Sequence, residues 1–130
     1  MPSTLIEVRR KYTPDQQVAL MNAVHEALVA AFKIPNDDRF IRLTEFEPHA
    51  MVNGPGEGVA DTYMRVTIDC FSGRSIEAKR DLYRQIVVRL AVHGIPHDHV
   101  SILLRESSPE NWGSGGVPAS DYDLGFKIEV

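Results

Sequence analysis

Residues 34–48, IPNDDRFIRLTEFEP, and residues 95–109, IPHDHVSILLRESSP, carry one pattern twice, at an offset of 61 residues. Seven of the fifteen aligned positions are identical without a gap, which chance explains poorly. In the first copy these positions are Ile34, Pro35, Asp37, Ile41, Leu43, Glu45 and Pro48. Because self-similarity at a fixed spacing indicates a duplicated structural unit, the sequence predicts a fold built from two copies of one unit.

A helix is predicted before each copy of this pattern. Thr13, Pro14 and Gln16 form a helix start, because Thr13 and Gln16 can make a capping box and proline suits the first helical position. The apolar face expected to follow consists of Val18, Met21, Val24, Leu28, Ala31 and Phe32. Ser75 is the predicted cap of the second helix. Its apolar stripe consists of Ala78, Leu82, Ile86 and Leu90, and ends before Gly94 and Pro96.

Strands are predicted on both sides of each helix. Residues 64–70 alternate between apolar and polar side chains, as a strand with one buried face does. The other expected strands are Leu5–Arg9, Phe40–Phe46 and Val100–Leu104. Right-handed crossovers make the strands of each unit parallel. The predicted fold is therefore α+β, a tandem β-α-β repeat with a four-stranded mixed sheet and two helices on one face.

The chain length fits one domain of 130 residues. We divide it into units at about 2–50 and 60–109, linked by a flexible segment or hairpin tip at Asn53–Gly58 and followed by a turn-rich tail with a short strand at Phe126–Val130. A sheet covered on one face only favours oligomerisation.

The composition excludes several classes of protein. The chain is 43% apolar and 25% charged with a net charge of -4, so it lacks the basic excess that binds phosphate backbones, and we expect no nucleic-acid partner. No apolar run is long enough to span a membrane, and no signal peptide is evident. Cys70, the only cysteine, excludes an internal disulfide and fits a reducing compartment. The expected location is the cytoplasm.

Several short motifs resemble one known family. Residues 30–40, AAFKIPNDDRF, with Pro48-His49 after them, are similar to the malonate semialdehyde decarboxylase group of the tautomerase superfamily. Residues 111–116, NWGSGG, resemble the tryptophan-glycine loop near the C-terminus of those proteins. Members of the superfamily carry tandem β-α-β units and a catalytic amino-terminal proline, and Pro2 occupies that position once Met1 is removed. The resemblance implies a homotrimer with an apolar pocket around Pro2.

The resemblance also assigns residues to a site. It implies that Asp38 positions water or shares a proton with Pro2, and that Arg74 binds the carboxylate of a small substrate. Arg39 and Trp112 are further candidates for substrate contacts. The decarboxylase has a second arginine two residues after the first, and Ile76 stands there in this chain; a bulky aromatic of its loop is also replaced, near Ser114. Because a pair of guanidinium groups is suited to hold a carboxylate and its neighbouring carbonyl, these departures weaken the decarboxylase interpretation.

The chemistry expected from these residues is proton transfer without a cofactor. An ordinary α-amino group has a pKa of about 8, and burial near Arg74 or Arg39 would lower the pKa of the Pro2 amine, since both disfavour the ammonium form. A neutral amine could act as general base in a keto-enol tautomerase for a small 2-oxo or enol carboxylate. If Pro2 is instead protonated, it could act as an acid in hydration while Asp38 activates water.

Alternative interpretations stay open from the sequence. The second enzymatic one is a malonate semialdehyde decarboxylase or haloacrylate-type hydratase, and the non-enzymatic one is a trimeric binding protein that has kept the fold. Asp38 could pair with Arg39 in a surface turn, Arg74 could be a solvated residue at a helix entrance, and Trp112 could simply pack.

The remaining motifs favour structural roles. No metal site is predicted, because Gly94 and Pro96 break the helix that would align His93 with His97. The expected core thiol is Cys70.

Overall fold

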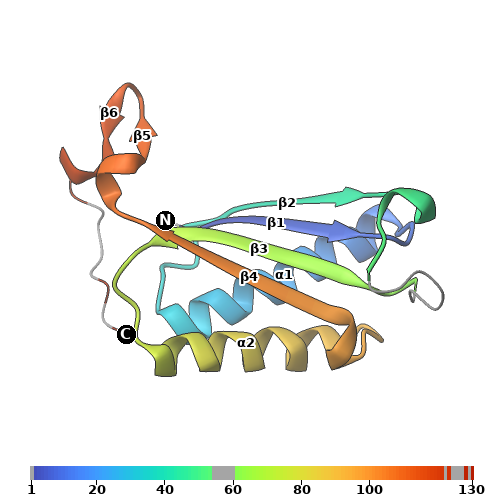
Figure 1. The fold of residues 1–130 in the computed structure, drawn as a ribbon. Helices are drawn as coiled ribbons and strands as arrows, with labels where there is room; N and C mark the ends of the chain where they lie inside the picture. The colour runs from blue at the N-terminus through green and yellow to red at the C-terminus, as the bar shows by residue number, and fades with distance from the viewer. Residues whose placement is uncertain (1, 54–60, 122, 124–127, 129) are drawn as a thin grey trace.

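The structure, a computed structural model, describes residues 2–53, 61–121, 123, 128 and 130. Its strands and helices follow one another as β1 (Ser3–Val8), α1 (Pro14–Phe32), β2 (Phe40–Glu45), β3 (Met64–Phe71), α2 (Ile76–Ala91), β4 (Val100–Ser107), β5 (Gly113–Ser114) and β6 (Val117–Pro118). Short 3-10 helices occupy Pro48–Ala50, His97–His99, Pro109–Asn111 and Ala119–Asp121. Both long helices cover the same face of the sheet (Figure 1). Residues 54–58 of the expected link and most of the expected strand over 126–130 lie outside the described residues.

The main sheet joins two β-α-β units through their first strands. Its order is β2-β1-β3-β4. Strand β1 runs parallel to β2, and β3 runs parallel to β4, whereas β1 and β3 are antiparallel. The predicted fold class, four-stranded mixed sheet and placement of both helices on one face are therefore confirmed.

The predicted helix starts are correct in detail. The Thr13 side chain accepts a hydrogen bond from the Gln16 amide at 3.2 Å, and the Gln16 side chain accepts one from the Thr13 amide at 2.9 Å, which completes the capping box of α1. The Ser75 hydroxyl accepts from the Ala78 amide at 3.1 Å at the start of α2. Together these contacts satisfy backbone donors that a helix leaves without partners at its first turn.

The hydrophobic core fills the space between the sheet and the two helices. All four residues of the stripe predicted for α2 are buried, and Cys70 is buried on β3. The core side chains of the central strands alternate with outward-facing residues, as the sheet geometry requires.

One part of the predicted α1 face is wrong. Val18 is exposed and Met21 is only half-buried, whereas Leu20 and Ala27 are buried. Each three-residue step along an α-helix turns about 60° less than a full rotation, so a run of such steps from Val24 back to Val18 leaves the buried face. The face that packs against the core passes through Leu20 instead.

Each predicted strand also differs from the observed one at one limit or both. Strand β4 continues past Leu104 to Ser107, because β3 extends to Phe71 and Phe71 pairs with Ser107. Strand β1 ends at Val8 rather than Arg9, and the Arg9 side chain donates to the Pro48 carbonyl at 3.0 Å.

The surface of α2 carries paired charges. Arg80 pairs with Glu77, Arg84 pairs with Asp81, and Arg89 contacts Glu26 of α1. None of the described helices is both long enough and apolar enough to cross a membrane. Within the described ranges, no three histidine, cysteine or acidic side chains are grouped so that they could hold a metal ion.

Candidate active site

The chain places its amino terminus at one end of the sheet, where several elements meet. Ser3 pairs with Phe40 of β2 and with Asp69 of β3. Continuing this register by one residue brings Pro2 level with Arg39 on one side and Cys70 on the other. Strands β3 and β4 finish at this end and α2 begins there (Figure 1). Residues that follow the strands in sequence are therefore gathered around Pro2.

An apolar hollow lies beside the amino terminus. It has a volume of about 230 Å³ and is lined by Pro2, Ser3, Phe40 and Trp112. Pro2 is buried, although it precedes the first strand. The structure thus brings together two of the residues that the sequence singled out, Pro2 and Trp112.

Packing fixes the wall that Trp112 contributes to this hollow. Its indole nitrogen donates to the Ser107 hydroxyl at 2.8 Å. Its ring meets Phe71 edge to face, with 5.2 Å between ring centroids and 76° between ring planes. Because both ends of the indole are held, Trp112 is a rigid wall rather than a mobile surface side chain.

Arg74 is buried close to this wall. Only 5% of the residue is exposed. Its Nη1 donates to the Phe71 carbonyl at 3.2 Å, and its guanidinium carbon lies 4.8 Å from the centroid of the Phe32 ring. Phe71 therefore links the two features, because its ring packs on Trp112 and its carbonyl holds Arg74.

Two nitrogens of this guanidinium remain available. Nε and Nη2 of Arg74 are buried and have no hydrogen-bond partner in the part of the chain that the structure describes. Burial lowers the pKa of Arg74 from its ordinary value, while the charges of Glu106 and Asp38 act in the opposite direction. The pKa of an arginine is so high that the group still carries its charge near neutral pH. A buried cation with donors to spare is costly unless an anion completes its shell, so the arrangement suits a bound carboxylate.

The other two residues suggested by the sequence take different positions. Asp38 is half-buried in the turn before β2, its amide donates to the Pro35 carbonyl at 3.1 Å, and its charge acts on Arg74. Arg39 is exposed and donates to the Asn22 side chain of α1. Among the described residues, neither Asp38, Arg39 nor Arg74 lines the hollow itself.

Sequence reasoning missed several residues of this region. Phe40 lines the hollow and is exposed, although it is aromatic. Its position as the first, outward-facing residue of the edge strand β2 was a usable signal, because the side chain is large and aromatic and stands next to the predicted site residue Arg39. Phe32 and Phe71 gave no such signal, since both look like ordinary core residues in the sequence.

Cys70 lies next to these residues, and its thiol is unreactive. Burial raises the pKa of its thiol, and the Arg74 charge only partly opposes this. The thiol therefore stays protonated near neutral pH and acts as a small apolar side chain.

The architecture and this site define a class of protein: tandem β-α-β units with a buried proline at position 2 and a buried arginine at the same end of the sheet. A family model described as tautomerase enzyme matches residues 38–115. The chain belongs to the tautomerase family.

Solved structures of the superfamily resemble the whole chain. The FG41 malonate semialdehyde decarboxylase inhibited by 3-bromopropiolate is 29% identical, with a TM-score of 0.80 over 91% of this chain and 92% of that one. A second malonate semialdehyde decarboxylase is 28% identical, with a TM-score of 0.80 over 91% and 94% of the two chains. A fused 4-OT symmetric trimer is 25% identical, with a TM-score of 0.78 over 90% and 95%. Comparison with curated proteins gave no match.

Proposed function

We propose that this chain is a cofactor-free keto-enol tautomerase, an isomerase that acts on a small 2-oxo or enol carboxylate with Pro2 as general base. One observation carries the proposal. Pro2 is buried in the wall of an apolar hollow. At the same end of the sheet, Arg74 is buried with two nitrogens that have no hydrogen-bond partner among the described residues. A base and an anion-binding group in one water-poor place are what proton transfer next to a carboxylate requires.

The reaction assigns a step to each residue. Removal of Met1 makes Pro2 a secondary amine, and its apolar surroundings and the nearby Arg74 favour the neutral form of that amine. The amine takes a proton from the enol hydroxyl or from the carbon next to the keto group and returns it at the other position. Arg74 holds the substrate carboxylate through Nε and Nη2 and stabilises the negative charge of the enolate.

The surrounding residues select the rest of the substrate. Phe40 and Trp112 supply apolar walls for its carbon skeleton. Asp38 lies within electrostatic range of Arg74 and serves to orient that guanidinium or a water molecule. Arg39 is an exposed cation that stands level with Pro2 when the register of β1 and β2 is continued by one residue, and it offers a second contact for a substrate with a polar far end.

Two measurements test this function. Intact mass shows whether Met1 is removed, because retained methionine turns the Pro2 nitrogen into an amide without useful basicity. Ketonisation of phenylenolpyruvate and 2-hydroxymuconate is then followed with wild type, Pro2→Ala and Arg74→Gln. Arg80→Gln is the matched control, since Arg80 lies on the exposed side of α2 and pairs with Glu77.

Pro2→Ala should lower kcat/KM by about a hundredfold, the lower end of what one general base contributes. Arg74→Gln should raise KM on both substrates by about tenfold, as expected for a lost charge-assisted hydrogen bond. Rates that Pro2→Ala leaves unchanged would end the tautomerase proposal. Retained Met1 or inactivity of the wild type on every substrate would favour a trimeric binding protein.

A second candidate function is decarboxylation of malonate semialdehyde, or hydration of a haloacrylate-type substrate. Its support is the identity of 29% and 28% to malonate semialdehyde decarboxylases along nine-tenths of the chain. Ile76 argues against this function, because it stands where the decarboxylase has its second arginine. A wild type that decarboxylates malonate semialdehyde faster than it ketonises either enol would establish this candidate instead.

A further inference from the structure

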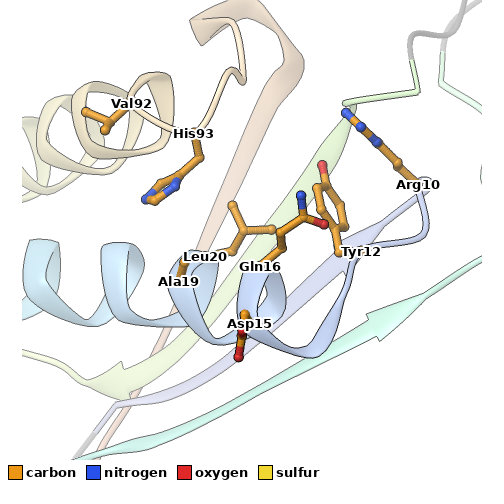
Figure 2. A pocket seen from close by; sticks show the side chains of 8 residues that line it. All are labelled: Arg10, Tyr12, Asp15, Gln16, Ala19, Leu20, Val92 and His93. Atoms are coloured by element: carbon orange, nitrogen blue, oxygen red, sulfur yellow. The ribbon is translucent and has the colours of Figure 1, made fainter.

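A second cavity lies away from Pro2, at the opposite end of the sheet. Its volume is about 480 Å³, within the range of small-molecule sites. It is formed where α1 begins and α2 ends (Figure 2). The lining residues are Arg10, Tyr12, Asp15, Gln16, Ala19, Leu20, Val92 and His93. None of them takes part in the proposed tautomerase chemistry.

Hydrogen-bond donors gather on one side of this cavity. The Arg10 guanidinium carbon lies 5.4 Å from the centroid of the Tyr12 ring. Arg10 has no carboxylate partner in the described part of the chain, whereas its neighbours Arg9 and Lys11 pair with Asp61 and Glu47. Arg10 is therefore a cation stacked on Tyr12, and the N–H groups at the edge of its guanidinium remain to bind an anion.

Three further side chains of the lining add donors to the cation. The Gln16 side-chain oxygen accepts a hydrogen bond from the Thr13 amide at 2.9 Å, so the Gln16 NH2 group remains as a donor for a ligand. Burial raises the pKa of Tyr12, although the Arg10 charge opposes this, so the hydroxyl keeps its proton. Figure 2 shows the His93 ring reaching from the end of α2 toward α1. An imidazole in either protonation state offers at least one N–H.

The rest of the lining is apolar. Leu20 is buried and forms the floor together with Ala19. Val92 is 81% exposed, which is unusual for a branched aliphatic side chain at the mouth of a cavity. The carboxylate of Asp15, the single acidic group of the lining, points away from Gln16 and His93 (Figure 2).

We propose that this cavity is a second small-molecule site that binds an organic monocarboxylate with an apolar body. Arg10 and the Gln16 amide hold the carboxylate, and Leu20 and Val92 cover the apolar part. The site does not depend on the chemistry at Pro2.

The experiment uses benzoate as the probe and the whole ¹⁵N-labelled protein. Because benzoate can also reach Arg74, the titration is followed residue by residue through amide chemical shifts and is repeated in Arg74→Gln. We expect the amides of Tyr12, Ala19 and His93 to shift in both proteins with one common Kd. Benzamide, which has the same shape without the charge, should bind at least about tenfold more weakly.

Two variants test the assignment within the cavity. Arg10→Gln should raise the benzoate Kd at these amides by about tenfold, and Val92→Asp should raise it further by placing a like charge at the mouth. Both positions are exposed, so neither change threatens folding, and Arg80→Gln serves as the control with an unchanged Kd. The proposal is overturned if benzoate shifts only residues around Pro2, if it shifts none, or if Arg10→Gln leaves the Kd unchanged.

Discussion

Arg74 is a charged side chain that the fold isolates from water and then satisfies only in part. The Phe71 carbonyl accepts a hydrogen bond from one of its nitrogens, and the Phe32 ring lies under its guanidinium plane. These two contacts define the direction of the group, and the two nitrogens without a partner in the described part of the chain remain for a ligand. The ring of Phe32, which touches no substrate in this arrangement, is therefore expected to act as a positioning group.

Phe32→Leu should weaken carboxylate binding without removing the base. A cation-π contact between partly desolvated groups contributes enough that its loss should raise KM about fivefold, with kcat little changed. The measurement is a KM and kcat comparison on phenylenolpyruvate. Ile86→Val, a truncation in the buried stripe of α2, controls for the loss of core packing. If Phe32→Leu raises KM no more than Ile86→Val does, Phe32 has a packing role only.

At the scale of elements, helix starts determine where the chain turns back onto the sheet. The capping box of α1 joins Thr13 and Gln16, and the same Gln16 lines the distant cavity. At the other end of the molecule the first turn of α2 follows Arg74 directly. Helix starts therefore shape both the candidate active site and the second cavity.

Thr13→Ala should lower the free energy of unfolding by about 1 kcal/mol, because the first turn of α1 loses its side-chain acceptor. Thr13→Ser keeps that acceptor and should stay close to wild type. Denaturant unfolding at one fixed chain concentration measures the difference. Equal losses in both variants would mean that the threonine methyl group, not the cap, carries the effect.

The first residue of α2 offers a test of substrate choice. Ile76 is 52% exposed, so a longer side chain can be accommodated there. Ile76→Arg supplies a second guanidinium two residues after Arg74 and should speed malonate semialdehyde decarboxylation about tenfold over wild type. Ile76→Gln has similar reach without the charge and should not. If the two variants decarboxylate equally, the missing arginine is not what limits that reaction.

At the scale of the whole molecule, the sheet has one face covered by helices and one face left open. Leu5, Thr67 and Leu103 stand side by side on the open face by strand register. Leu103 is 42% exposed in the single chain. A fused 4-OT protein of the same fold forms a symmetric trimer. We propose that this chain also forms a homotrimer and that the open face is buried in it.

Leu103→Asp should shift the protein from the trimer mass to the mass of one chain, because a carboxylate at this position would be buried without a partner. Val88→Asp is the matched control: Val88 is 55% exposed, but on the outer side of α2, so its variant should remain trimeric. Size-exclusion chromatography coupled to light scattering measures the mass of the oligomer. A trimer that tolerates Leu103→Asp would place the interface elsewhere.

The sequence by itself determined the units from which this protein is built. The repeat around Ile34-Pro35 and Ile95-Pro96, the caps at Thr13 and Ser75, and the alternation along β3 are local signals, since each depends on side chains a few residues apart. Such signals predicted the two helices, the four main strands and the family resemblance that pointed to Pro2 and Arg74. They failed at Val18, where spacing suggested burial and helix rotation gave exposure.

Only the tertiary structure decided what surrounds those residues. The antiparallel contact of β1 with β3 brings Pro2 to the end of the sheet where Phe71 and Arg74 follow. Burial of the Arg74 charge, its stacking on Phe32, and the lining of one cavity by both Arg10 and His93 each depend on elements far apart in the chain. No local pattern encodes them, because the environment of a charge is set by whatever packs around it.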